Sequence, residues 1–541
     1  MERHVPLVSM DASRKIDLEA INEWDFNTHA LIEAAAQACQ RAFLKNYPGF
    51  FNTNKKIAVF AGTGNNGADA LSILRCMILE GLVQTDSSIV IISRFPDPAS
   101  PLASIYNSLK KMQVPFIEWD KSLVKKPLLV DCDIIIDGIA GTGVQSALTG
   151  NLLEMTEKIN AEASSSKLVV SVDVPSGLYD NWTEGEPIVN ADYTLAIEPL
   201  KHCLYKPKSR ASAGTIVFTG NIFPQALIDS HIEHQQKCFL VNWDRAKKEI
   251  PCFKPDIHKY QRGTIEIHAG SQGMTGAAIL AARASQAAGA GLVRLIVDNE
   301  IYPIAASGLA AKAAGIMVSA NNTEKCNAED NRFVPDSILL GSGWGRAESR
   351  IDVLHKALDL EKKGMPLVLD ADAIFLARDF SFSGNTLLTP HIGEFAVFTG
   401  LDKKQIENNP IPILLEIAGQ KNAYILLKSH VMYIASPDKG LGIIDGMVPG
   451  LACGGTGDLL AGFCASLAGR MSASGHLTAG GHLAASGKAD LFACAAAAAS
   501  LLIQAGKDLE SKGRIPDPLE IADQVADLAG SAWIAKPAWL N

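Results

Sequence analysis

The sequence predicts two α/β domains, each with a mostly parallel β-sheet covered by helices on both faces. Three observations predict this. The chain of 541 residues is too long for a single hydrophobic core. Short apolar runs alternate with helical stretches along nearly the whole chain, which is the pattern of parallel strands joined by crossover helices. The alternation is interrupted once, by a mixed and polar region near the middle, and no internal repeat is evident.

The first alternating series runs from about residue 10 to residue 230. Its predicted strands are Ile57–Ala61, Ile89–Ser93, Ile134–Asp137 and Leu168–Val172. The region Ser230–Asp256, in which two prolines flank Cys252–Lys254, is the predicted linker. We therefore predict domains at residues 1–230 and 236–541.

The second series follows the predicted linker. Its predicted strands are Thr264–Ile267, Leu292–Val297, Ile338–Leu340, Leu367–Leu369 and Tyr424–Leu427. Two apolar helical faces are predicted at Leu459–Ala468 and Leu491–Gln504. The run Leu491–Ile503 is the most apolar of the chain, but it is too short to cross a bilayer and is expected to form a buried helix.

Charge, targeting signals and cysteines narrow the class of function. The net charge of −9 leaves no basic surplus to neutralise phosphates, so no nucleic-acid partner is expected. The charged N-terminal segment lacks the apolar region of a signal peptide, so we expect a cytoplasmic protein without a membrane partner. The ten cysteines are scattered without a C-x-x-C pair, which favours reduced thiols over disulfides or a metal site.

A glycine-rich turn, Gly62–Gly67 (GTGNNG), follows the first predicted strand and opens a predicted helix over Ala68–Glu80. Backbone amides at such a helix start can hold an anion. An NAD redox site would also need an acidic residue at the end of the second strand, where the sequence has Ser93–Phe95 (SRF). The turn is therefore expected to face a ligand rather than to form an ordinary NAD(H) redox site.

Two further strand ends carry aspartates. Asp137 closes one strand and precedes the turn Gly141–Gly143, and Asp173 closes another and precedes Pro175–Gly177. The carboxyl ends of parallel strands form the ligand edge of a sheet, so these loops should converge. Either aspartate alone could be a helix cap or turn former. Together, carboxylates at such an edge can transfer protons or bind a hard cation.

The segments Gly64–Gly67 (GNNG) with Asp69, Asp137, and Ser171–Gly177 (SVDVPSG) resemble the YjeF N-terminal domain, the NAD(P)HX epimerase family. The resemblance spans residues 10–225 and implies interconversion of the R and S epimers of hydrated NADH or NADPH. It implies that Asn66, Asp137 and Ser176 hold a potassium ion, and that Asp173 is the acid/base residue. The implied substrate contacts are Asn65, Asn66, Gly67, Ala68, Asp69, Gly141, Thr142, Gly143, Val144, Gln145, Ser146 and Ala147.

The chain departs from this family pattern at a few positions. Ala68 and Ala70 stand where the family favours glycine, and Leu31–Ala36 (LIEAAA) stands where many members read LMENAG. Each added methyl group could crowd a loop that works by close backbone approach.

The strongest motif is Gly454–Gly462 (GGTGDLLAG). Its glycines let backbone N–H groups converge at a helix start, which predicts an anion hole for a transferring phosphoryl group. Asp458 beside that hole could take a proton from a substrate hydroxyl, and the alternative is an N-terminal helix cap. The chain has no Walker A motif, so nucleotide binding is expected to rest on this site.

This motif resembles the ribokinase-like superfamily, and further segments resemble its NAD(P)HX dehydratase branch over residues 236–541. The segments that carry the resemblance are His258–Lys259, Gly270–Ala277, Ala288–Val293, Gly341–Gly345, Leu369–Ala373, Thr389–Glu394 and Leu427–Lys428. That branch uses ADP or ATP to dehydrate the S epimer to NAD(P)H. The expected metal is Mg²⁺ shared with the phosphates.

The resemblance also implies roles for residues of this second domain. Ala277, Gly343, His391 and Asp458 would contact the hydrated cofactor, with a structural turn as the alternative for His391. The implied nucleotide-binding residues are Lys428, Ser429, His430, Val431, Met432, Gly454, Gly455, Thr456 and Gly457. The segment at 428–432 reads KSHVM where the family usually has KGxxT.

The two resemblances together predict a two-step repair enzyme for damaged nicotinamide cofactors, expected to form a homo-oligomer. One alternative is a small-molecule kinase, for a vitamin or carbohydrate-type substrate, with a ligand-binding regulatory N-terminal domain. Another is a nucleotide-sensing scaffold with an inactive N-terminal site. The sequence leaves open the choices between ADP and ATP and between NADHX and NADPHX.

Overall fold

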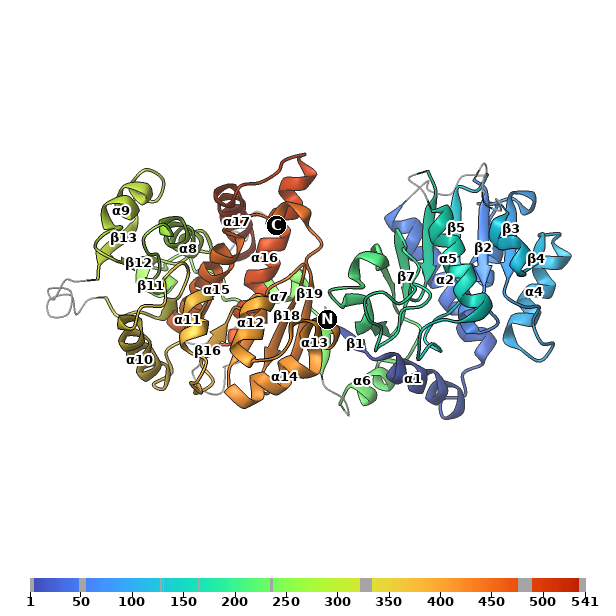
Figure 1. Cartoon of the computed structure of the whole chain (residues 1–541), viewed down its shortest axis with the longest axis horizontal. Coiled ribbons are helices and arrows are strands. Elements are labelled where there is room, and N and C mark those ends of the chain that lie inside the picture. The colour runs from blue at the N-terminus through green and yellow to red at the C-terminus, as the bar shows by residue number, and fades with distance from the viewer. Residues whose placement is uncertain are drawn as a thin grey trace. The chain divides into compact units, whose positions relative to one another are not determined.

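The structure is a computed structural model. It describes residues 4–47, 55–126, 129, 131–163, 166–233, 237–321, 333–474 and 489–534. The chain divides into two compact units (Figure 1). The N-terminal unit contains residues 6–238, and the C-terminal unit contains residues 239–541 together with residues 1–5.

The N-terminal unit is built on a seven-stranded parallel sheet with the order β4-β3-β2-β5-β6-β7-β9. The strands are β2 (Ile57–Ala61), β3 (Ser88–Ile92), β4 (Phe116–Glu118), β5 (Ile134–Gly138), β6 (Leu168–Val172), β7 (Tyr193–Ile197) and β9 (Thr215–Thr219). A separate short parallel pair joins β1 (Val5–Val8) to β8 (Leu200–Lys201).

Helices cover both faces of this sheet. They are α1 (Met10–Asn22), α2 (Thr28–Asn46), α3 (Asn65–Leu79), α4 (Pro101–Lys111), α5 (Gly150–Glu162) and α6 (Gln225–Glu233). Alternate residues of β2 point to opposite faces, as the strand geometry requires. Ile57 and Val59 belong to one hydrophobic cluster with residues of α2 and α3, whereas Phe60 belongs to another that includes Ile159 of α5.

The strand order places a topological switch point between β2 and β5. From β2 the chain adds β3 and β4 on one side, and from β5 it adds β6, β7 and β9 on the other. The loops that leave β2 and β5 therefore turn to opposite faces and open a crevice at the carboxyl ends of the strands. The glycine turn after β2 and the aspartates at the ends of β5 and β6 meet at this edge.

The C-terminal unit has the strand order β13-β12-β11-β14-β15-β16-β17-β18-β19-β10. Neighbouring strands from β13 to β17 pair in parallel, and β18 is antiparallel to β17 and to β19. The strands are β10 (Cys238–Leu240), β11 (Thr264–His268), β12 (Leu292–Val297), β13 (Ile316–Ala320), β14 (Ser337–Leu340), β15 (Leu367–Leu369), β16 (Thr386–Leu388), β17 (Tyr424–Leu427), β18 (Val431–Ser436) and β19 (Gly440–Asp445).

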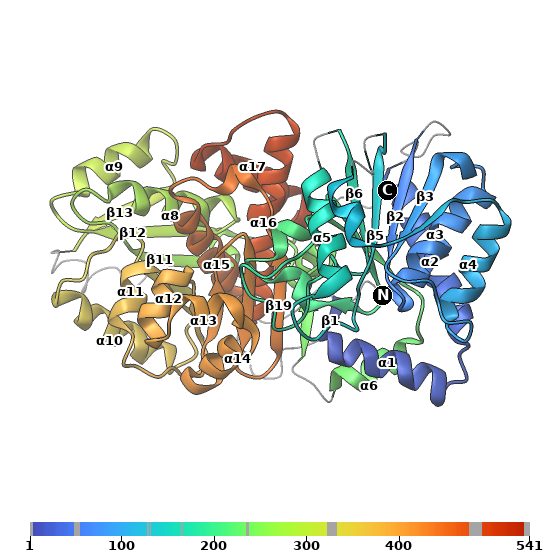
Figure 2. The same ribbon diagram turned by 45° about the vertical axis from the view of Figure 1, so that its right-hand side comes forward.

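The helices of this unit form a layer on each face of the sheet (Figure 2). One layer contains α8 (Thr275–Ala287), α15 (Thr456–Ala473), α16 (Leu491–Ser511) and α17 (Pro518–Trp533). The other contains α10 (Ser349–Glu361), α11 (Ala371–Leu376), α12 (Ile392–Thr399), α13 (Lys403–Asn408) and α14 (Pro410–Lys421). The unit also has α7 (Trp243–Glu249) and α9 (Tyr302–Ala310).

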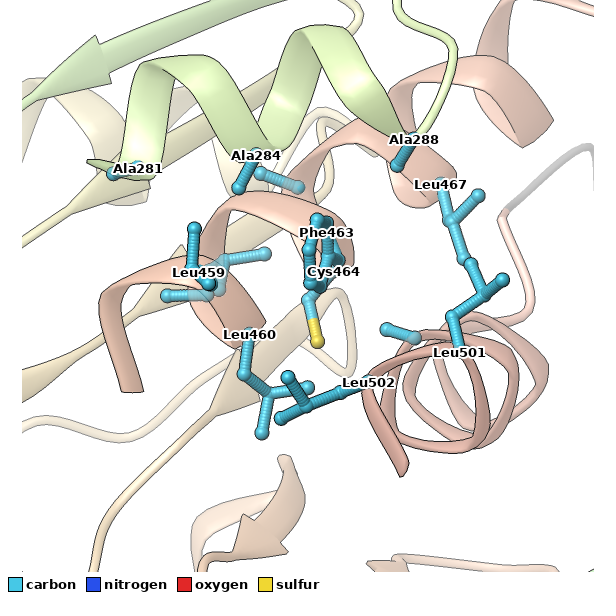
Figure 3. Packing of buried hydrophobic residues seen from close by; sticks show 14 of the residues in the cluster. Ala281, Ala284, Ala288, Leu459, Leu460, Phe463, Cys464, Leu467, Leu501 and Leu502 are labelled. Atoms are coloured by element: carbon cyan, nitrogen blue, oxygen red, sulfur yellow. The ribbon is translucent and has the colours of Figure 1, made fainter. Parts of the chain in front are cut away.

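The core of the unit is formed where α8, α15 and α16 pack together (Figure 3). Small alanines of α8, such as Ala281 and Ala284, face α15, whose larger Phe463 and Leu467 fill the space between the helices. The two helices approach so closely that a Cβ atom on Gly462 would lie 2.3 Å from the carbonyl oxygen of Ala281. This contact fixes α15, and α15 carries Asp458 in its first turn.

We expect Gly462→Ala to destabilise the C-terminal unit. The new methyl group would meet the backbone of α8 and also lie 2.7 Å from Cβ of Ala284, and such overpacking costs about 1–3 kcal/mol. The matched control is Gly419→Ala in α14, where nothing lies within 4 Å and the better helix propensity of alanine should stabilise by up to about 1 kcal/mol. Thermal unfolding midpoints of the two variants should move in opposite directions. A rise in both midpoints would contradict the prediction.

The predicted strands are confirmed to within one residue. The bounds of β2, β6, β12, β15 and β17 are those predicted, β3 begins and ends one residue earlier, and β5, β11 and β14 are each one residue longer.

The predicted linker is wrong in its central part, because that part contains β10 and α7. The amide of Val241, between these two elements, donates to the carbonyl oxygen of Ile443 in β19. Val241 and Ala246 are buried in the core of the C-terminal unit. Because polar residues surround these apolar side chains in the sequence, the hydrophobic pattern did not predict the two elements.

The predicted burial of the apolar helix is confirmed, but the helix extends beyond the apolar run Leu491–Ile503 and is longer than expected. The helix α16 has the length and composition of a membrane span, but 83% of its apolar window is buried inside the protein. The nine cysteines in the described part of the chain are all free.

Candidate functional site

A pocket of about 530 Å³ opens at the switch point of the N-terminal sheet. Its walls come from α1, α2, the start of α3, the loops after β2, β5 and β6, and the segments that follow β7 and β9. Its polar and charged lining residues include Ser13, Arg14, Asp17, Thr63, Asn65, Asn66, Asp69, Thr142, Asp173, Glu198 and Lys201. The predicted acid/base residue Asp173 therefore lies in a pocket of the right size for a small ligand.

Asp173 is held by an ion pair at the end of β6. The ammonium group of Lys201 donates to Oδ1 of Asp173 at 2.5 Å and to the carbonyl oxygen of Ile197 at 3.0 Å. Asp173 has a φ of +67°, in the left-handed region that residues other than glycine rarely adopt. Such strain persists only where the surroundings impose it, and it is common at functional sites. Lys201 is only 2% exposed, so the carboxylate has a fixed and buried partner.

Two more aspartates line the same pocket. Burial raises the pKa of Asp17 to about 6, while the charge of Lys201 lowers it and that of Asp173 raises it. Burial, Asp173 and Asp17 raise the pKa of Asp69 well above its usual value. Both carboxyl groups therefore keep their protons to a higher pH than a free carboxyl group does, which suits groups that donate and accept protons near neutral pH.

The three predicted potassium ligands lie around the end of β5. The Asp137 carboxylate accepts hydrogen bonds from the hydroxyl groups of Ser176 at 2.5 Å and Ser171 at 2.7 Å, and from the amides of Ser176 at 2.9 Å and Ile139 at 3.2 Å. Burial raises its pKa. Asn66 is buried, and neither its Oδ1 nor its Nδ2 has a hydrogen-bond partner among the described residues.

These residues fit a potassium ion in their chemistry, since amide, hydroxyl and carboxylate oxygens are the donors that a hard cation takes. The unpartnered Oδ1 of Asn66 is the observation that favours a ligand here, because a buried polar atom without a partner is costly. Within the described ranges, no group of three or more His, Cys, Asp or Glu side chains could hold a metal ion. Any cation at this position must therefore use the mixed oxygen set.

The pocket brings together only part of the predicted substrate set. Asn65, Asn66, Asp69, Gly141, Thr142, Gly143, Val144 and Asp173 line it, whereas Gly67, Ala68, Gln145, Ser146 and Ala147 do not. Gly67 and Ala68 are buried behind the pocket wall.

The two alanines that replace family glycines do not crowd the pocket. Ala68 and Ala70 are fully buried in the hydrophobic cluster on the α3 face of the sheet. A Cβ atom on Gly138 would lie 2.4 Å from Cβ of Ala70, so the glycine at the end of β5 makes room for this methyl group. The substitutions change the packing behind the glycine turn and leave its ligand face open.

Sequence reasoning missed Asp17, Arg14 and Lys201. Arg14 donates to the carbonyl oxygen of Thr142 at 2.8 Å and so ties the loop after β5 to α1. None of the three belongs to a glycine turn or a strand end of the predicted sheet. The only local signal is that Arg14 and Asp17 share one face of a helix.

In the C-terminal unit, Asp458 lies in the first turn of α15. The N-cap is Gly455, with a φ of +99° and no side-chain cap, so the alternative of Asp458 as the cap is wrong. Burial raises the pKa of Asp458 to about 6, with further contributions from Asp370, which raises it, and Lys428, which lowers it. A Cβ atom on Gly457 would lie 3.4 Å from Nζ of Lys428, which places the lysine against the helix start.

A buried network holds Lys428 in this position. Asp370, only 2% exposed, accepts from Nζ of Lys428 at 2.7 Å, from Thr389 at 2.9 Å and from Ser342 at 2.9 Å. Nζ of Lys428 also lies 4.0 Å from Oε2 of Glu394. Burial lowers the pKa of Lys428, but the carboxylates of Asp370 and Glu394 outweigh this and raise it. The lysine is therefore a fixed positive charge beside the backbone N–H groups at the start of α15.

Ala277 and Gly343 are brought together as predicted. A Cβ atom on Gly343, where φ is +57°, would lie 2.9 Å from Cβ of Ala277. His391 has the structural role that was its alternative: it caps α12 by accepting from the amides of Gly393 at 2.9 Å and Glu394 at 3.2 Å. Its side chain is still 59% exposed, so the ring can also meet a ligand.

The predicted nucleotide segment divides into two parts. Val431 and Met432 are buried in β18, so only their backbone could reach a ligand. Lys428, Ser429 and His430 precede the strand, and His430 is exposed. The predicted side-chain contacts are thus confined to the turn between β17 and β18.

Comparisons with known proteins agree with this geometry. Residues 28–203 match the family model described as the YjeF-related protein N-terminus, and residues 265–521 match the model described as NAD(P)H-hydrate dehydratase. The bifunctional NAD(P)H-hydrate repair enzyme Nnr of Methanothermobacter thermautotrophicus is 30% identical over 432 residues, which cover 76% of this chain and 78% of that protein. The chain belongs to this family of bifunctional repair enzymes.

Other relatives carry the same description. Nnr of Moorella thermoacetica is 28% identical over 482 residues, which cover 86% of this chain and 88% of that protein. A solved structure of the ADP/ATP-dependent NAD(P)H-hydrate dehydratase from Bacillus subtilis, co-crystallised with ATP and Mg²⁺, is 22% identical with a TM-score of 0.45. It covers 54% of this chain and 97% of its own chain. Membership in the family confirms both resemblances and the fold class of two α/β domains.

Proposed function

We propose that this chain repairs hydrated nicotinamide cofactors in two steps. The N-terminal pocket interconverts the R and S epimers of NAD(P)HX, and the C-terminal site dehydrates the S epimer to NAD(P)H with ADP or ATP and Mg²⁺. The observation that carries the proposal is the C-terminal site, where Asp458 and the partly buried Lys428 lie at the glycine start of α15, which has no side-chain cap. Relatives over most of the chain bear the name of a bifunctional repair enzyme, which supports both steps.

In the dehydration step, Asp458 takes the proton of the ring hydroxyl as that oxygen attacks the terminal phosphoryl group of the nucleotide, and the bond from this group to the remaining nucleotide, which departs, breaks. Lys428 and the amides of Gly454–Gly457 face the negative charge that develops on the phosphoryl oxygens. Departure of phosphate from the ring carbon, with loss of a proton from its neighbour, restores the double bond. The Mg²⁺ ion would be bound mainly by the nucleotide phosphates.

In the epimerisation step, Asp173 is the proton-transfer residue and Lys201 orients it. A potassium ion held by Asn66, Asp137 and Ser176 would supply a fixed positive charge at the end of β5 and satisfy the buried Asn66 amide oxygen. Removal of potassium should therefore slow epimerisation and leave dehydration of the S epimer unchanged.

The test is the near-ultraviolet absorbance of reduced nicotinamide in a mixture of R- and S-NADHX with ADP or ATP and Mg²⁺. Full conversion to NADH, faster than spontaneous epimerisation, is the expected result. Conversion that stops at the S fraction would leave a dehydratase with an inactive first domain. Absence of NADH with either nucleotide would overturn the proposal, and a phosphorylated product would favour the small-molecule kinase.

The rate of dehydration should fall in acid. The pKa of Asp458 is raised to about 6, and the group acts as a base only when ionised. The turnover number should therefore be constant above this pH and decrease about tenfold per pH unit well below it. The measurement uses the pure S epimer with nucleotide and Mg²⁺ saturating at every pH, so that titration of the nucleotide does not limit binding. A flat profile down to about pH 5 would contradict the role of Asp458 as base.

A further inference from the structure

Asp17 is a carboxyl group in the N-terminal pocket to which no sequence motif points. It lies on α1, and the residues of α1 that line the pocket with it are Ser13, Arg14, Leu18 and Ile21. Their spacing puts them on one face of the helix, so α1 forms a wall of the pocket. The side chain of Asp17 makes no hydrogen bond to any of the described residues, whereas its neighbour Arg14 bonds to Thr142 and to Asp11.

The pocket is built to receive a polar ligand. The buried Asn66 amide lines it without a partner among the described residues, and Asp173 and Lys201 form a buried ion pair in its wall. Asp173 comes from the end of β6 and Asp17 from α1, so the two carboxyl groups enter the pocket from different elements. Oδ1 of Asp173 is engaged by Lys201, and its Oδ2 accepts no hydrogen bond from the part of the chain that the structure describes.

Inversion of the hydrated ring carbon requires proton transfer on both faces of the ring. The hydroxyl group must leave from one face, and an oxygen must return on the other. A single fixed carboxylate can reach only one of these positions, because a proton donor or acceptor must lie within hydrogen-bond distance of the atom it serves. Asp173 alone therefore cannot exchange protons with oxygen atoms on both faces of the ring.

We propose that Asp17 is a second catalytic residue of the epimerase, which exchanges a proton with the oxygen on the ring face opposite to the one that Asp173 serves. The inference rests on the proposed epimerase function. The protonated Asp17 gives its proton to the ring hydroxyl, the carbon–oxygen bond breaks, and water leaves while the ring nitrogen forms a double bond to that carbon. A water molecule then adds to the other face, the nitrogen regains its electron pair, and Asp173 accepts the proton of the added water.

The reverse direction uses the same groups with their roles exchanged, as microscopic reversibility requires. The charged groups that line the pocket with Asp17 are Arg14, Asp69, Asp173, Glu198 and Lys201. Burial raises the pKa of Asp17 to about 6, against the charge of Lys201, so both of its protonation states are accessible near neutral pH. Burial and the neighbouring carboxylates of Asp173 and Asp17 also raise the pKa of Asp69 above its usual value.

The experiment follows NADH formation from mixed epimers by the full-length chain with nucleotide and Mg²⁺. The S epimer reacts in a fast phase, and the R epimer reacts in a slow phase set by epimerisation. Asp17→Asn should slow the second phase by about 10²-fold or more and leave the first phase unchanged. Asp131→Asn, a change at a 78% exposed aspartate of the same unit that does not line the pocket, is the matched control and should leave both phases unchanged.

The pH profile separates proton transfer from a structural role. The slow phase of the unchanged protein should depend on a group with a pKa near 6, and Asp17→Asn should lose this dependence while Asp17→Glu retains it. A slow phase of normal rate in Asp17→Asn, or a lowered rate with the original pH profile, would overturn the inference. Failure of the proposed epimerase function gives a different result. The unchanged protein would then convert the R epimer no faster than spontaneous epimerisation does.

Discussion

Asp458→Asn is expected to abolish most of the dehydratase activity, with a loss of about 10²–10⁴-fold in turnover. The amide has nearly the shape of the carboxylate but cannot accept the hydroxyl proton. Asp458 lies in the first turn of α15 and makes no capping hydrogen bond, so the helix should remain intact. The measurement is NADH formation from the pure S epimer at saturating nucleotide.

The matched control is Asp359→Asn, at a side chain that is 69% exposed on α10 of the same unit. This variant should keep the turnover of the unchanged protein. If Asp458→Asn also kept it, proton abstraction by Asp458 would be excluded. Loss of nucleotide binding in Asp458→Asn would instead assign the residue to the nucleotide site, and equilibrium binding of ADP or ATP distinguishes these outcomes.

The second large effect is expected for Asp173→Asn in the N-terminal pocket. Removing the charge leaves the buried Lys201 without its partner and removes the proton-transfer group. The rate of the slow phase, which reports conversion of the R epimer, should fall by about 10²–10⁴-fold. The fast phase should be unchanged, since dehydration of the S epimer takes place in the other unit.

This prediction requires a check of folding, because an unpaired buried cation destabilises a protein by about 3–5 kcal/mol. A double variant, Asp173→Asn with Lys201→Met, removes both charges and should recover thermal stability without recovering epimerisation. The control Asp131→Asn changes an aspartate that is 78% exposed in the same unit and should have no effect. Epimerisation at the normal rate in either Asp173 variant would show that another group inverts the ring carbon.

The sequence by itself determined the elements and the motifs. The apolar run of β2, the glycines that follow it and the aspartates that close β5 and β6 are local patterns, and each was predicted where the structure places it. The glycine motif before α15 was likewise sufficient to locate Asp458. These features follow from backbone conformation and hydrophobic periodicity over a few residues, which a single sequence displays directly.

Local patterns failed where polar residues surround an element. The segment with β10 and α7 reads as a linker, but its apolar side chains are covered by the C-terminal sheet and its helices. The motif also gave an incomplete role for His391. This residue was expected to contact the ligand, and in the structure its ring nitrogen caps α12. Val431 and Met432 were predicted to lie along the nucleotide, and the pairing of β18 with two strands buries them.

Only the tertiary structure showed that Asp17 and Lys201 share a pocket with Asp69 and Asp173. Asp17, Asp69, Asp173 and Lys201 come from four separate elements, and nothing in their spacing relates them. They meet because Asp69 and Asp173 follow the carboxyl ends of β2 and β6, and because α1 and the segment after β7 line the same pocket at that edge of the sheet. Their electrostatic coupling depends on distance in a buried site, whereas a sequence specifies only separation along the chain.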